Sequence, residues 1–109
     1  MKQCEKCLKM FEDNEFVRGE TYKAIDEHHN PPKFLMDKDK WKGELPFLCR
    51  ECHREIHNII IRMMNKKAGT LKFLNSEHWL LKKMSLNQRD ELAVEVFNFT
   101  KEWLKDGNS

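Results

Sequence analysis

Two Cys-x-x-Cys pairs constrain this chain more than any other feature of its sequence. One pair lies close to the N-terminus and the other follows a long insert; together they contain every cysteine of the chain, Cys4, Cys7, Cys49 and Cys52. Four thiolates can bind one Zn²⁺ tetrahedrally, with Zn–S bonds of ~2.3 Å. Because no cysteine is left over, we predict a structural Zn²⁺ that closes the insert at its base and contributes folding free energy rather than chemistry. Redox dithiols or unrelated buried thiols are the alternative.

The composition is typical of one small soluble domain. Of the 109 residues, 35% are charged and 39% are hydrophobic, which allows a modest core beneath a solvated surface. The sequence contains no apolar run of membrane-spanning length, and its N-terminus lacks the basic-then-apolar pattern of an export signal. We therefore expect a cytoplasmic location, where cysteines are thiolates or metal ligands rather than disulfides.

Positive charge is concentrated in the middle of the chain. The formal net charge is only +2, but residues 50–83 contain eight Lys or Arg against three Glu. A basic segment can face phosphates, because each neutralised phosphate releases a counterion. A solvated protein surface is the more common explanation for such an excess, so the charge alone assigns no partner.

Four of the five histidines fall in two clusters near the cysteines. His28 and His29 follow a predicted strand over 21–25 and precede two prolines, at which that strand must stop. Adjacent strand residues face opposite sides, so one histidine could bind a metal while the other faces a substrate. A pair of surface histidines beside a turn is the alternative. His53 and His57 lie four residues apart at the start of a predicted helix, so their imidazoles can reach one point.

Hydrophobic periodicity predicts the elements around these clusters. A second short strand is expected over 44–48, and the helix that begins near Cys49 should end before Gly69. The apolar stripe of this helix consists of Ile56, Ile59, Ile60 and Met63. The loop over 30–43 places Phe34 and Trp41 among lysines. These aromatic rings could lie against a nucleic-acid backbone or fold back onto the protein.

Two further helices are predicted in the C-terminal part of the chain. Asn75 or Ser76 could cap a short helix through Met84, in which His78 is expected to be a surface or core residue rather than a metal ligand. Ser85 and Gln88 resemble a capping box for a final helix to about Lys105. The predicted buried stripe of that helix consists of Leu92, Val96, Phe99 and Trp103.

The ordered set of motifs resembles the HNH endonuclease family. It comprises the first Cys-x-x-Cys, the Glu-His-His-x-x-Pro turn over 27–32, and Leu-Cys-x-x-Cys-His followed by a further histidine. The resemblance runs from Cys4 to about His57 and is to the variant with a four-cysteine structural zinc. It implies an α+β fold with a zinc-braced ββα-metal (His-Me finger) core over 1–67. Residues 68–109 would form a helical C-terminal extension within a single domain over 1–109.

The resemblance also assigns roles to the histidines. His28 matches a metal ligand and His29 the general base, while His53 and His57 match the further metal ligands of members that use three histidines. One position departs from the family: Glu44 stands where an Asn usually orients the base. The carbonyl or carboxylate of Glu44 could take over that role or approach the metal, and Asn30 is another residue that could compensate.

The implied activity is metal-dependent hydrolysis of DNA, double-stranded DNA above all, leaving 5′-phosphate and 3′-hydroxyl ends. An imidazole can take a proton from water near neutral pH, and one divalent ion can bind the scissile phosphate and the departing oxygen. Three histidines suit Zn²⁺, Ni²⁺ or Mn²⁺ better than Mg²⁺, although many nucleases of this kind use Mg²⁺ or Mn²⁺. Candidate contacts to flanking phosphates are Lys33, Arg50 and Arg54.

Two other interpretations fit the same residues. Glu44 in place of Asn is compatible with a zinc-stabilised DNA-binding module whose HNH site is degenerate. A closed shell of three histidines plus Glu44 would instead indicate a second structural ion. Small stand-alone nucleases of this type often look like phage or mobile-element proteins, which suggests a context but no pathway. The sequence leaves a monomer and a dimer equally open.

Overall fold

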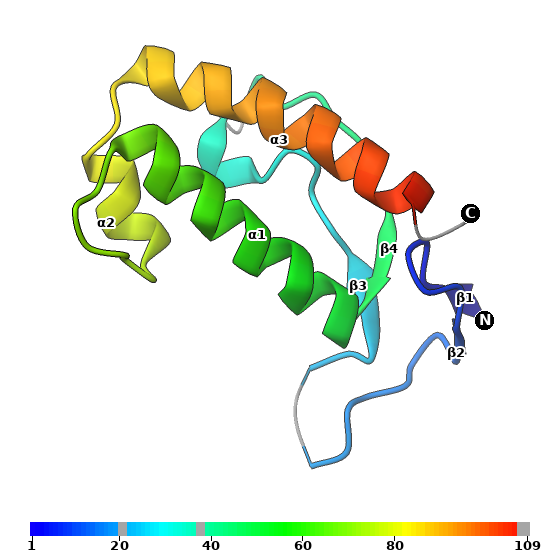
Figure 1. Ribbon diagram of the computed structural model, residues 1–109. Coiled ribbons are helices and arrows are strands. Elements are labelled where there is room, and N and C mark those ends of the chain that lie inside the picture. Colours follow the sequence, from blue (N-terminus) through cyan, green and yellow to red (C-terminus); the bar gives the residue numbers. More distant parts are fainter. Residues whose placement is uncertain (20–21, 37–38, 107–109) are drawn as a thin grey trace.

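The protein is a small α+β fold in which two short sheets lie near one end of two long helices (Figure 1). The computed structural model describes residues 1–19, 22–36 and 39–106. Within these ranges the elements are β1 (Lys2–Gln3), β2 (Met10–Phe11), β3 (Ile25–Glu27), the 3₁₀-helix η1 (Lys33–Leu35), β4 (Phe47–Cys49), α1 (Arg50–Ala68), α2 (Glu77–Lys82) and α3 (Leu86–Asp106). The α+β class predicted from the sequence is confirmed.

The N-terminal hairpin is held against the second sheet by two hydrogen bonds between Glu5 and Phe47. Strands β1 and β2 are antiparallel, with Lys2 opposite Phe11. The N–H of Glu5 donates to the carbonyl of Phe47 at 2.8 Å, and the N–H of Phe47 donates to Oε2 of Glu5 at 2.7 Å. This reciprocal contact fixes the turn that carries the first cysteine pair beside β4, which ends at Cys49, the first cysteine of the second pair.

Strands β3 and β4 form an antiparallel pair that leads directly into α1. Ile25 lies opposite Cys49, and an isolated bridge continues the same register to Asn30 and Glu44. Between them the N–H of His28 donates to the carbonyl of Pro46 at 2.8 Å. The pairing therefore reaches past both histidines of the turn, although the regular strand ends at Glu27.

The predicted strands over 21–25 and 44–48 are both misplaced along the chain. The observed strands start at Ile25 and Phe47, and Thr21 lies outside the described residues. The register that forms buries Ile25 and Leu48 completely, whereas the ring of Tyr22 stays exposed and lies against Arg50. Burial against α1 selects this register, and alternation along a five-residue segment does not reveal it.

Helix α1 is the element on which the core is built. It begins directly after Cys49 and ends at Ala68, and the φ of 66° at Gly69 gives the left-handed C-cap expected of a glycine there. Its buried residues are Cys52, Ile56, Ile60, Met64 and Asn65. Helix α3 runs alongside α1 in the opposite direction, and α2 closes the far end (Figure 1). The predicted bounds of α1 are confirmed.

The two C-terminal helices begin at the predicted caps. The Ser76 side chain caps α2, and Ser85 and Gln88 exchange hydrogen bonds of 2.8 and 3.2 Å in a capping box before α3. The predicted stripe of α3 is wrong at Phe99, which is 40% exposed. Thr100 is buried in its place, because it continues the face that begins at Leu92 and Val96 whereas residue 99 is rotated away from it.

The described parts of the loop over 30–43, residues 30–36 and 39–43, fold back onto the protein. Helix η1 packs against α3, Leu35 is buried, and Phe34 and Met36 contact the main core. Trp41 is half-buried, and its Nε1–H donates to the carbonyl of Pro31 at 2.6 Å. The fold-back alternative is thus the one observed for the aromatic residues of this loop.

Among the described residues, no helix is long and apolar enough to cross a membrane.

Gly43 occupies a position that only glycine fits. A Cβ atom there would collide with the backbone oxygen of Asn30 and would lie 2.8 Å from Cζ2 of Trp41. That oxygen accepts a hydrogen bond from the N–H of Glu44 at 2.9 Å, so Gly43→Ala should disrupt the bridge that ends the hairpin. We expect Gly43→Ala to lower the free energy of unfolding by about 1–3 kcal/mol in urea denaturation.

The matched control for this prediction is Lys42→Ala, which truncates an exposed side chain in the same loop. Its effect should stay within about 0.5 kcal/mol. Equal stability of the Gly43→Ala and Lys42→Ala proteins would contradict the close approach at Gly43.

Candidate metal centres

The four cysteines meet where the N-terminal hairpin reaches the start of α1. Cys4 and Cys7 lie in the turn between β1 and β2, Cys49 ends β4, and Cys52 lies in the first turn of α1. The four sulfur atoms lie within 4.8 Å of one another, and those of Cys7 and Cys49 are 3.8 Å apart. A tetrahedral ion with Zn–S bonds of ~2.3 Å would place its sulfur ligands about 3.8 Å apart. The cluster could therefore hold a structural metal such as Zn²⁺.

The electrostatics of the cluster favour a bound cation. Burial opposes ionisation of the Cys4 thiol, but hydrogen bonds from backbone groups near Cys49, Cys7 and Lys6 outweigh it and lower its pKa to about 7. Burial raises the pKa of Cys49, and burial together with the neighbouring thiols raises that of Cys52. Four thiolates this close would repel one another, and a divalent cation among them removes that cost. Cysteines from both pairs converge on one point. Two independent redox dithiols, the alternative interpretation, would have no need to converge.

Three histidines form a second group from two elements. His28 follows β3, while His53 and His57 lie one turn apart on α1. Their ring centroids are 4.6–5.3 Å apart, and the Nε2 atoms of His53 and His57 are 3.0 Å apart. One ion with metal–nitrogen bonds of ~2.0–2.1 Å separates neighbouring nitrogen ligands by about 2.9–3.4 Å, depending on its geometry. The three nitrogens, which all lie within 4.8 Å of one another, could therefore hold one metal ion.

His28 is in a state suited to binding a metal. Its side chain is 1% exposed, and no hydrogen-bond partner for its Nε2 is present among the described residues. Burial lowers the pKa of His28 to about 3, with further lowering by the nearby His53, His57 and His29. Burial lowers the pKa of His53 as well. A neutral imidazole with a buried nitrogen that lacks a partner is the form that ligates a metal ion.

His57 has a carboxylate neighbour on a different helix. Its Nδ1 lies 3.6 Å from Oε1 of Glu77, which is the first residue of α2. Sequence reasoning missed Glu77, because nothing near it in the sequence marks it as part of the site. Only the packing of α2 against α1 brings it there.

His29 lies in the same cleft but has different neighbours. A cavity of about 400 Å³ is lined by Glu27, His28, His29, Pro32, Lys33, Phe34, His53 and His57. The half-buried His29 ring meets that of Trp41 edge-on, with centroids 5.3 Å apart. Trp41 is in turn fixed by its hydrogen bond to Pro31. His29, the predicted base, thus borders the predicted ligands and lies against Trp41, a residue that the sequence suggested either for contact with a nucleic-acid backbone or for packing on the protein.

Glu44 does not join the histidines. Its side chain is 52% exposed, with Oε1 3.8 Å from Nζ of Lys101 on α3, and its carbonyl accepts the N–H of Asn30 at 3.0 Å. Within the described part of the chain, the metal-ligand group contains the three histidines without Glu44. A closed shell of three histidines plus Glu44 is therefore not formed. Asn30 is fully buried, and its Nδ2 donates to the carbonyl of Phe97 at 3.3 Å, which anchors the backbone beside His29 to α3.

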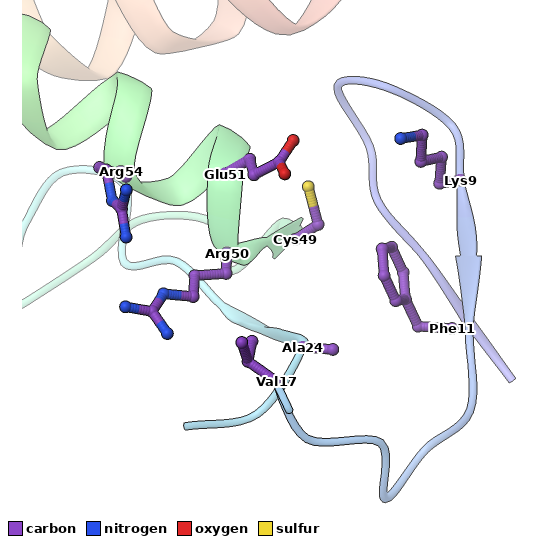
Figure 2. A pocket seen from close by; sticks show the side chains of 8 residues that line it. All are labelled: Lys9, Phe11, Val17, Ala24, Cys49, Arg50, Glu51 and Arg54. Carbon is purple, nitrogen blue, oxygen red and sulfur yellow. The ribbon is translucent and has the colours of Figure 1, made fainter. Parts of the chain in front are cut away.

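The three predicted phosphate-binding residues lie in different places. Lys33 lines the histidine cleft, and Arg50 shares a neighbouring cavity of about 480 Å³ with His53. Arg50 and Arg54 together line a third cavity, of about 370 Å³, beside Cys49. Figure 2 shows both arginines projecting from α1, across this cavity from Lys9 and Phe11. Of the three predicted phosphate-binding residues, Arg54 therefore lines neither of the two cavities that contain histidines.

Comparisons of this chain with family models, with curated proteins and with solved structures found no match. We therefore infer its function from the geometry of the two candidate metal centres.

Proposed function

We propose that this chain is an HNH-type endonuclease that hydrolyses DNA phosphodiester bonds with the help of one divalent metal ion. The observation that carries the proposal is the convergence of His28, His53 and His57 beside His29 in one cleft. In this proposal β3, β4 and α1 form a ββα-metal core, and the four-cysteine cluster holds its structural zinc. The antiparallel β3–β4 pair that leads directly into α1 supports it.

The three clustered histidines would hold the ion. When bound, that ion would neutralise charge on the scissile phosphoryl group and stabilise the departing 3′ oxygen. The candidate ions are Mg²⁺, Mn²⁺, Ni²⁺ and Zn²⁺. Histidine ligands disfavour Mg²⁺ without excluding it, so the metal scan described below identifies the ion. The open cleft in front of the ligands leaves room for a phosphate group.

His29 would act as the general base. It would take a proton from a water molecule as the water oxygen bonds to phosphorus and the bond from phosphorus to the 3′ oxygen breaks. Trp41 restricts the ring of His29, and Asn30 anchors the adjoining backbone to α3, so these two residues do the orienting that the family assigns to its Asn. Lys33 and Arg50 border the histidines and would bind the flanking phosphates.

One observation favours a second candidate, a non-catalytic zinc-stabilised module that binds DNA. The Glu44 carboxylate is turned toward Lys101, so the residue in the family's Asn position places no side-chain group at the site. In that case the basic residues along α1 would hold DNA without cleavage. The two candidates differ in whether the phosphodiester bond is broken.

The decisive experiment is a supercoiled-plasmid nicking assay with purified protein, scanned over Mg²⁺, Mn²⁺, Ni²⁺, Co²⁺ and Zn²⁺. We expect metal-dependent nicking that the chelator EDTA stops and that His53→Ala reduces about 10²-fold or more, because one ligand is lost. The matched control is His78→Ala, which removes an exposed histidine on α2 and should nick like the wild type. An absence of nicking with every metal, together with salt-sensitive binding of DNA, would establish the binding module instead.

A further inference from the structure

We infer that Glu77 is a positioning residue for the histidine metal centre, in which its carboxylate accepts a hydrogen bond from Nδ1–H of His57. The inference rests on the part of the proposed function in which the three histidines bind a metal ion. It assigns a role in that centre to α2, which lies outside the stretch that resembles the nuclease family.

The orientation of the His57 ring leads to this assignment. Its Nε2 lies 3.0 Å from Nε2 of His53 and so faces the other ligands, while its Nδ1 faces Glu77. A neutral imidazole that ligates through Nε2 carries its proton on Nδ1, and that proton needs an acceptor. The carboxylate of Glu77 is placed to be that acceptor.

The present distance is that of an ion pair rather than a hydrogen bond. Oε1 of Glu77 is 3.6 Å from Nδ1, and the side chains of His57 and Glu77 are 35% and 36% exposed. A rotation of the partly exposed Glu77 side chain that shortens the contact by about 0.5 Å makes a hydrogen bond. The backbone of Glu77 is fixed, because Ser76 caps α2 and Leu80 anchors it in the core.

A carboxylate in this position changes the ligand in two ways. It fixes the tautomer and the direction of the imidazole, and it raises the basicity of the nitrogen that binds the metal. Removing such a partner typically weakens metal binding about 10–100-fold. A purely local role for Glu77, as an acid in the first turn of a helix, would change stability and leave metal affinity unchanged.

The test is a titration with Co²⁺, followed by visible absorption in the absence of DNA, of protein that has been loaded with one Zn²⁺ per chain so that the histidines are left free. Zinc content measured at the end shows that the cysteine cluster has kept its own ion. We expect Glu77→Ala to weaken Co²⁺ binding about 10–100-fold. Glu77→Gln should lose less, because its amide oxygen still accepts from Nδ1–H. The matched control is Glu55→Gln, which removes the same charge from an exposed residue of α1 that faces away from His57.

The outcomes separate this inference from the proposed function. If the wild type binds Co²⁺ at the histidines and Glu77→Ala binds it equally well, the positioning role is wrong and the metal centre stands. If the wild type binds no Co²⁺ there, both the metal centre and the role of Glu77 are wrong. Circular dichroism shows whether each variant is folded. Should Glu77→Ala fail to fold, Glu77→Leu takes its place, because it removes the acceptor but keeps an aliphatic side chain, and wild-type affinity in that variant would overturn the inference.

Discussion

Loss of metal from the four-cysteine cluster is expected to unfold the N-terminal half of this protein. The strands β1 and β2 are two residues long, and the turn between them contacts the rest of the protein mainly through the cysteines, the hydrogen bonds between Glu5 and Phe47, and the contact of Lys6 with Trp103 on α3. So small a unit cannot bury enough apolar surface to be stable alone. Structural zinc contributes about 10–16 kcal/mol of apparent binding free energy in zinc-finger peptides, which is more than most small domains have in total.

Two serine variants separate the loss of metal from the loss of packing. Cys52 is buried and Cys7 is exposed, so Cys52→Ser disturbs the core whereas Cys7→Ser does not. If the metal holds the fold, both variants should lose the zinc and melt at a similarly reduced temperature, as should the wild type treated with a strong chelator. Zinc analysis and thermal denaturation followed by circular dichroism provide the readouts. A wild-type protein that keeps its melting temperature after the chelator has removed its zinc would overturn a structural role for the metal.

Features with a local physical cause could be predicted from the sequence. The C-cap of α1 needs only a glycine at 69, and the capping box before α3 needs only a serine and a glutamine three residues apart. The predicted strand positions were wrong because strand pairing and burial select the register. The sequence around Tyr22 and Ile25 is compatible with more than one register. The prediction for Phe99 was wrong because helical spacing allowed either residue 99 or residue 100 at the edge of the buried face, and Thr100 is the one that is buried.

In the candidate site, too, features with a local cause could be predicted from the sequence and features that depend on tertiary packing could not. Its proposed ligands come from short motifs whose spacing already places them together: two Cys-x-x-Cys pairs, and two histidines one helical turn apart. Glu77 and Trp41 have no such signal, because one depends on α2 packing on α1 and the other on the loop over 30–43 folding back. Residues that orient a ligand are chosen by tertiary contacts, so a single sequence reveals the ligands before their partners.

Replacing His29 with alanine is expected to lower the rate of DNA cleavage about 10²–10⁴-fold, which is the usual contribution of a general base. The ring of His29 contacts Trp41 and lies outside the group of three ligand nitrogens. Affinity for Co²⁺ at the histidine centre should therefore stay close to that of the wild type. The measurements are the single-turnover nicking rate under saturating metal and the same Co²⁺ titration that tests Glu77.

The contrast between His29→Ala and His53→Ala then assigns the roles. Both variants should lose cleavage, but only His53→Ala should also lose metal, because His53 faces His57 and His28 whereas His29 does not. Added imidazole should restore part of the activity of His29→Ala, since the substitution leaves space in the cleft and removes only a proton acceptor. Full activity in His29→Ala would mean that another group takes the proton. The contact between His29 and Trp41 would then serve only to pack the loop against the hairpin.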